Sequence, residues 1–149
     1  MTLLKCFLLV FVLTFATSVR SECYFNECDC EEYQVVCKAL TEFPSRNFQY
    51  DNGMESIPNV EIIESDIARI PAGRMDGMDI EMANFRESGI SDIDPHAFDN
   101  AKIYQINLKN NKIYHIDERT FTPLADTLEI LILGYNDLHF MGKLIDFYS

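Results

Sequence analysis

Four segments of the chain repeat one pattern of apolar and polar positions, beginning 23, 23 and 25 residues apart. Their sequences are IPNVEIIESDIARI (57–70), IEMANFRESGISDI (80–93), IYQINLKNNKIYHI (103–116) and LEILILGYNDLHFM (128–141). Each follows the frame apolar-x-x-apolar-x-apolar-x-x-N-x-apolar-x-x-apolar, with serine in place of the asparagine in the first two. We number its fourteen positions from the first apolar residue. Because four units agree in phase, the pattern indicates a stacked repeat protein and not a single amphipathic helix.

The frame predicts one short strand in each unit. Positions four and six point inward, whereas positions three, five and seven point outward. Position nine, where the chain leaves the strand, must satisfy backbone groups inside the coil, and an asparagine amide can both donate and accept there. A serine does so only in part, so we expect the first two coils to be looser. The position-nine ladder is Ser65, Ser88, Asn111 and Asn136, and further apolar anchors follow at Met75, Phe98 and Phe121.

This frame resembles that of leucine-rich repeat proteins over about residues 57–141. The resemblance implies an α/β solenoid, a short horseshoe with a parallel concave sheet. A single unit buries too little apolar surface to offset its conformational entropy, so the units must stack and both ends of the stack need covering.

Four of the five cysteines lie in the stretch CYFNECDCEEYQVVC, residues 23–37. Their spacing has no C-x-x-C redox motif and no pair of zinc-type C-x2-C motifs, and the three histidines lie far downstream. We therefore expect a disulfide framework, for which four cysteines allow three pairings.

The stretch CYFNECDCEEYQVVCKALTEFP is similar to the cysteine-rich N-terminal cap of extracellular leucine-rich repeat proteins. Cys28, Cys30, Cys37, Leu40, Phe43 and Pro44 match that cap. The resemblance implies the bonds Cys23–Cys30 and Cys28–Cys37, which would staple one end of the solenoid shut.

The N-terminus predicts the compartment. Residues 1–21 place Lys5 before an apolar run and small or polar residues after it, as in a secretory signal peptide cleaved after Ser18 or Ser21. The expected divisions are the signal peptide (1–21), the cap with an entry segment (22–56), the repeats (57–141) and an apolar tail (142–149). No second apolar run is long enough for a membrane span.

The charge excludes some partners. The whole chain carries a net charge of −12, and loss of Lys5 and Arg20 with the signal peptide leaves ten basic against 24 acidic side chains, or −14. This balance argues against nucleic acid and anionic membranes as partners, because both require a basic face.

The candidate chemistry is non-enzymatic. Asp92, Asp94 and His96 lack the glycine turn and bidentate glutamate of a calcium loop, and Asp94 before Pro95 is a natural cap for a turn. We find no arrangement around His115 typical of a catalytic nucleophile and no glycine-rich phosphate loop, so we predict no catalytic residues, no metal and no cofactor.

A protein partner is expected instead, on the concave sheet or at the open C-terminal end. The outward columns are Asn59, Met82, Gln105 and Ile130 at position three; Glu61, Asn84, Asn107 and Ile132 at position five; and Ile63, Arg86, Lys109 and Gly134 at position seven. We select Arg86, Lys109, Gln105, Asn107, Ile130 and Ile132 as partner-binding residues, with the two cations suited to an acidic group.

The C-terminal end has no second cysteine cluster, so Ile130 and Ile132 would be exposed unless something covers them. The apolar residues from Phe140 to Tyr148 would act as a makeshift cap, or a partner or second copy would bind there, or further repeats would follow. The last of these corresponds to an alternative function, a fragment of a larger extracellular-matrix or receptor ectodomain.

Two tracts, YFNECDCEEY and LADTLEILILGYNDL, are also similar to arthropod secreted leucine-rich repeat proteins related to the non-catalytic subunit of the Oplophorus luciferase. That resemblance implies a stabilising partner role. The sequence therefore favours a secreted, non-enzymatic protein-binding module.

Overall fold

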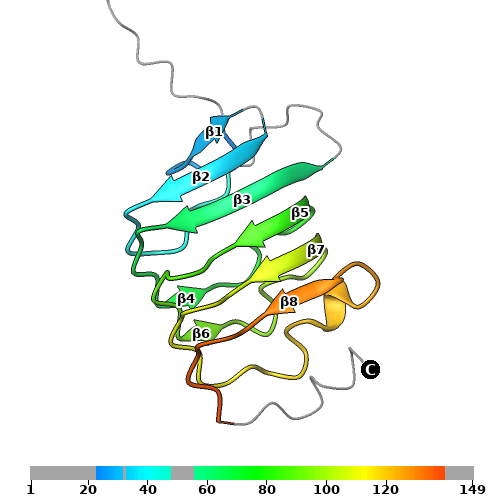
Figure 1. The fold of residues 1–149 in the computed structure, drawn as a ribbon. Coiled ribbons are helices and arrows are strands. Elements are labelled where there is room, and N and C mark those ends of the chain that lie inside the picture. The colour runs from blue at the N-terminus through cyan, green and yellow to red at the C-terminus, as the bar shows by residue number, and fades with distance from the viewer. Residues whose placement is uncertain (1–22, 32, 48–55, 140–149) are drawn as a thin grey trace, which may run out of the picture.

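The computed structural model describes residues 23–31, 33–47 and 56–139 (Figure 1). The expected signal peptide and apolar tail, together with most of the entry segment, lie outside these residues.

One six-stranded sheet runs along the molecule in the order β1-β2-β3-β5-β7-β8. The strands are β1 (Asp29–Glu31), β2 (Gln34–Lys38), β3 (Ile57–Ile63), β5 (Asp79–Asn84), β7 (Lys102–Asn107) and β8 (Ile130–Ile132). Only the β1–β2 pair is antiparallel, and the other pairs are parallel. The register joins Val60, Ala83, Ile106 and Leu131 across β3, β5, β7 and β8, as the repeat frame predicts. The fold is therefore a parallel-sheet solenoid.

The inward positions of the frame form the core. Positions four and six of the first three units are completely buried, at Val60, Ile62, Ala83, Phe85, Ile106 and Leu108. On the opposite side of each coil, Met75, Phe98 and Phe121 are buried as well, and the rings of Phe98 and Phe121 stack with centroids 5.5 Å apart. Each coil thus closes on its own apolar anchors and packs against the next.

The side of the coils opposite the main sheet carries almost no helix, so the α/β part of the expected fold is not what the described residues form. They contain two short paired strands, β4 (Arg69–Ile70) and β6 (Asp92–Ile93), and one 3₁₀ helix, η1 (Thr122–Leu124). The segment between Ile70 and Ile80 explains why, because it is short, begins with Pro71, and has Gly73 and Gly77 at positive φ. Such a segment turns the chain without room for a stable helix.

The residues at position nine form hydrogen bonds to the backbone inside the coils. The Asn111 Oδ1 accepts from the backbone N–H groups of Ser88 and Ile90, both at 3.0 Å. Its Nδ2 donates to the carbonyls of Phe85 (2.8 Å) and Leu108 (3.0 Å). Asn111 thus satisfies four backbone groups in a buried site.

The other ladder residues satisfy fewer groups. The Asn136 amide forms hydrogen bonds with three backbone groups: it accepts from the Ile113 N–H and donates to the Leu108 and Leu133 carbonyls. The Ser88 hydroxyl lies 3.1 Å and 3.0 Å from two carbonyls but has one proton for both, and the Ser65 hydroxyl makes two hydrogen bonds. Serine therefore satisfies fewer backbone groups than Asn111 does, as expected. That the first two coils are looser stays a prediction.

The N-terminal cap is joined to the repeats by a strand and by aromatic packing. Disulfides link Cys23 to Cys30 and Cys28 to Cys37, the pairing that the cap resemblance implies. Strand β2 pairs in parallel with β3, which places Val35 and Cys37 beside Val60 and Ile62 as inward residues. The ring of Phe43 makes edge contacts with Phe25 and Phe85, at 6.2 Å and 5.7 Å between centroids. The cap is thus built as an additional coil of the solenoid.

Position eight has a conformation that the sequence frame did not reveal. In the five successive coils it is occupied by Ala39, Glu64, Glu87, Asn110 and Tyr135, and all five have φ between 51° and 59°. This left-handed turn redirects the chain out of each strand, and among these residue types only asparagine adopts it at low cost.

Replacing Glu64 with asparagine should therefore stabilise the protein, by about 0.5 to 1 kcal/mol from relief of the left-handed strain. Glu64 is exposed, so the change removes no core contact. Urea unfolding of wild type and Glu64→Asn measures the effect. Glu42→Asn, the same substitution at an exposed residue outside the left-handed position, serves as control, and equal effects of the two substitutions would contradict the argument.

Candidate binding face of the sheet

The outward positions of β2, β3, β5, β7 and β8, with the residues directly after these strands, form what we call the open face. The three predicted columns lie in register here: Asn59, Met82, Gln105 and Ile130 are neighbours in successive strands, as are Glu61, Asn84, Asn107 and Ile132. At position seven, hydrogen bonds from Glu87 N–H to the Lys109 carbonyl and from Asn110 N–H to the Gly134 carbonyl continue the same register. The predicted partner-binding residues are thus brought onto one face.

The part of the open face over β3 and β5 is polar and internally bonded. The Asn84 Nδ2 donates to Glu61 Oε1 at 2.8 Å across the two strands. Asn84 is only 8% exposed, and its Oδ1 has no partner among the described residues. In the next strand, Asn107 Oδ1 accepts from the Lys109 N–H at 3.1 Å and so holds the backbone that carries this lysine.

The cations of the open face lack the acidic partners that cations have elsewhere. Across the described residues, ion pairs join Arg69 to Asp92 and Asp94, Lys102 to Asp79, Lys112 to Asp66 and Arg119 to Asp117. Arg86 and Lys109 are exposed, and neither forms an ion pair with a described residue. In a chain of net charge −12, two adjacent cations that form no ion pair with a described carboxylate make a local site for an anion.

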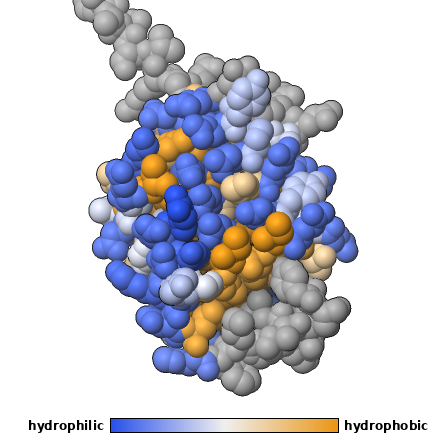
Figure 2. Space-filling view, viewed as in Figure 1, coloured by the Kyte–Doolittle hydropathy of each residue, from blue (hydrophilic) through white to orange (hydrophobic). Residues whose placement is uncertain are grey.

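The end of the open face at β8 is apolar. Ile130 is 47% exposed, as expected, whereas Ile132 is half-buried. Tyr135, which the sequence analysis did not select, is 78% exposed. Figure 2 shows hydrophobic surface over β8 beside hydrophilic surface over the middle strands. The Lys109 ammonium lies 5.2 Å from the centroid of the Tyr135 ring, so the cationic and apolar parts of the face adjoin.

Lys38 is a cation of this face that the repeat pattern missed. It pairs in register with Ile63, at position seven of β3, and forms no ion pair with a described residue. The sequence assigned Lys38 to the cap, and only the pairing of β2 with β3 places it in the column. The sequence feature that could have predicted this placement is the spacing of Val35 and Cys37, which match positions four and six of the frame.

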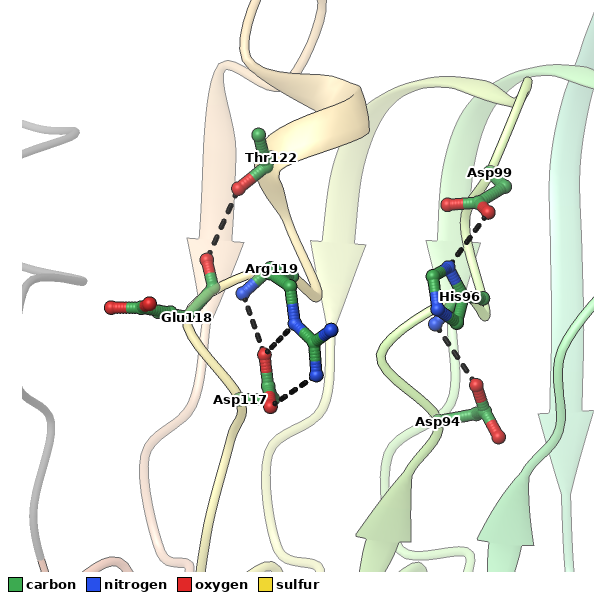
Figure 3. Close-up of polar contacts among 7 residues, drawn as sticks. All are labelled: Asp94, His96, Asp99, Asp117, Glu118, Arg119 and Thr122. Carbon is green, nitrogen blue, oxygen red and sulfur yellow. Dashed lines mark hydrogen bonds and ion pairs between the residues drawn. The ribbon is translucent and has the colours of Figure 1, made fainter.

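The acidic clusters act locally, as turn caps (Figure 3). Asp94 Oδ1 accepts from the His96 N–H at 2.9 Å, and the His96 Nδ1 lies 3.0 Å from Asp99 Oδ2. Asp117 accepts from the backbone N–H and the guanidinium of Arg119, with both contacts to Oδ1 at 2.9 Å. Within residues 23–31, 33–47 and 56–139, no three His, Cys, Asp or Glu side chains gather as metal ligands would.

The Arg119 side-chain and backbone hydrogen bonds lower the pKa of Asp117 from its usual value to about 2. Because the folded pKa lies below the unfolded value of 3.8, the stabilisation from this carboxylate is complete above that pH and is lost as the pH falls through about 2. Replacing Arg119 with alanine should raise the pKa of Asp117 toward 3.8, which an NMR titration of its carboxyl carbon would measure. Arg69→Ala should leave it unchanged, and a pKa of Asp117 that stays low in Arg119→Ala would contradict this assignment.

None of the helical structure in the described ranges is long and apolar enough to cross a membrane. No protein-family model matches the chain, and no curated protein is significantly similar to it. The assignment of function therefore depends on the geometry of the open face.

Proposed function

We propose that this protein is a secreted, non-enzymatic binding module of the leucine-rich repeat type, and that it binds a protein partner on the open face of its sheet. The observation that carries the proposal is the adjacency of Arg86 and Lys109, without ion pairs to described residues, in an acidic protein whose other exposed cations are largely neutralised. Extended sheet faces of solenoids provide rigid surfaces suited to protein recognition.

Two further features support the proposal. The Cys23–Cys30 and Cys28–Cys37 bonds are typical of proteins from oxidising, extracellular compartments, in agreement with a signal peptide at residues 1–21. The exposed Ile130 and Tyr135 offer apolar contact area next to the cations, and interfaces combine such contacts with a polar rim. A role as the stabilising partner of a secreted protein, or as a dimer joined at the β8 end, is compatible with this surface.

An affinity capture from the source secretion tests the proposal. Wild-type protein should retain a partner, and the double variant Arg86→Glu/Lys109→Glu should lose it, because two attractive contacts become repulsive. The matched control is Lys102→Glu/Lys112→Glu, which changes the net charge equally at exposed cations outside the outward columns. Equal capture by wild type and the Arg86/Lys109 variant would exclude these cations as the contact.

A further inference from the structure

Most of the described cations that lack a polar side-chain partner lie in one column. Among the described lysines and arginines, those for which the structure gives no side-chain partner other than an aromatic ring are Lys38, Arg74, Arg86 and Lys109. Three of these four occupy position seven of successive coils, in the column Lys38, Ile63, Arg86, Lys109 and Gly134. Neighbouring strands lie about 4.8 Å apart, so Arg86 and Lys109 present two positive charges at about that spacing on the backbone.

The surroundings of the column favour a short anionic segment over a long polyanion. Glu64 and Glu87 follow directly at position eight, and Glu61 lies at position five. A uniformly charged polymer laid along the column would meet these carboxylates as well as the cations. A segment with only two or three negative groups avoids them, because its charges need to face only Arg86 and Lys109.

At the C-terminal end of the column, a ligand would also contact apolar side chains. Apart from its two chain neighbours, no atom of the described residues lies within 4 Å of the place that a Cβ of Gly134 would occupy, so a side chain has room at this position. Ile130, which is 47% exposed, and Ile132 lie in the same strand, and Tyr135 follows Gly134. A ligand that reaches past Lys109 therefore meets apolar side chains within about one further strand spacing of 4.8 Å.

We propose that the open face binds an extended peptide segment with two acidic residues in alternate positions and an apolar residue two positions beyond them. In an extended chain, alternate side chains share one side at a spacing of about 6.6 Å. Arg86 and Lys109 are about 4.8 Å apart on the backbone, and their long side chains can spread to reach two carboxylates at this wider spacing, which brings the next ligand side chain on the same side over β8. This inference rests on the proposed function and specifies the chemistry of the partner.

Selection from a displayed library of random linear peptides on the immobilised secreted chain tests the inference. Wild type should enrich peptides with the acidic-x-acidic-x-apolar pattern, and fluorescence anisotropy of a synthetic enriched peptide then measures affinity. Gly134→Glu should weaken that peptide about tenfold or more, because the chain's own carboxylate would neutralise Lys109. Gly134→Gln, which fills the same open space without the charge, should change affinity by less than about threefold.

The outcomes separate this inference from the proposed function. Enriched peptides without acidic residues, or equal weakening by Gly134→Glu and Gly134→Gln, would overturn the acidic-apolar segment while leaving a protein-binding face. Failure to enrich any peptide, together with no partner captured from the secretion, would overturn both. Binding of a heparin hexasaccharide that depends on Arg86 and Lys109, with no peptide enriched, would assign the column to a sulfated polysaccharide and overturn the peptide proposal.

Discussion

Replacing Asn111 with alanine is expected to destabilise the protein by about 4 kcal/mol, because it leaves several buried backbone groups without a partner. The Asn111 amide bonds the Ser88 and Ile90 N–H groups and the Phe85 and Leu108 carbonyls, and the residue is only 7% exposed. Water cannot replace these bonds without opening the coil, so both N–H groups would lose their acceptor. Urea unfolding followed by circular dichroism would measure the change.

Ser88→Ala is the matched control for this prediction. It removes a hydroxyl at the equivalent position of the preceding coil, where a single proton serves two carbonyls, so the expected cost is about 1 kcal/mol. Asn136→Ala, with three lost bonds at a partly buried site, should lie between the two. If Asn111→Ala and Ser88→Ala destabilised the protein equally, the ladder would not derive its strength from the asparagine amide.

Removal of the Cys28–Cys37 bond by the double substitution Cys28→Ala/Cys37→Ala should cost about 3 kcal/mol, because a closed loop of this length restricts the unfolded chain by about that amount. The two cysteines are nine residues apart in sequence. Cys37 is completely buried at an inward position of β2, so its loss also weakens the packing of this strand on β3. Hydrogen exchange should then increase first in β2 and in the edge of β3 that faces it.

The single variants provide the internal control for the disulfide. Cys28→Ala already breaks the bond, so it should account for most of the loss seen in the double variant. The Cys23–Cys30 bond should remain, and mass spectrometry after alkylation would verify it. A double variant as stable as wild type, with unchanged exchange in β2, would show that the sulfurs do not hold this end of the solenoid closed.

Much of the fold was predictable because the repeat frame carries direct physical constraints. Val60, Ala83, Ile106 and Leu131 had to share a register, since a shift by one residue would turn every inward side chain outward. The columns that contain Arg86 and Lys109 follow from the same register. The asparagine ladder was also predictable, because few side chains can both donate and accept inside a coil.

Other features depended on contacts that the frame does not encode. The turn segments opposite the sheet form almost no helix among the described residues, because they are short, each contains a proline, and Gly73 and Gly77 turn the first of them. The left-handed conformation at position eight escaped notice because Ala39, Glu64, Glu87 and Tyr135 are poor sequence signals for positive φ. That conformation is imposed by the closing of each coil.

The sequence by itself determined the solenoid, its inward and outward faces and the ladder, because each follows from the period of apolar positions and from the bonding capacity of single side chains. Only the tertiary structure decided that the cap continues the sheet through β2, which adds Lys38 to the cationic column. The tertiary structure also decided which cations are neutralised, because ion pairs such as that of Arg69 with Asp92 join residues from different coils. Pairing across coils depends on how they stack, and no local pattern in the chain specifies it.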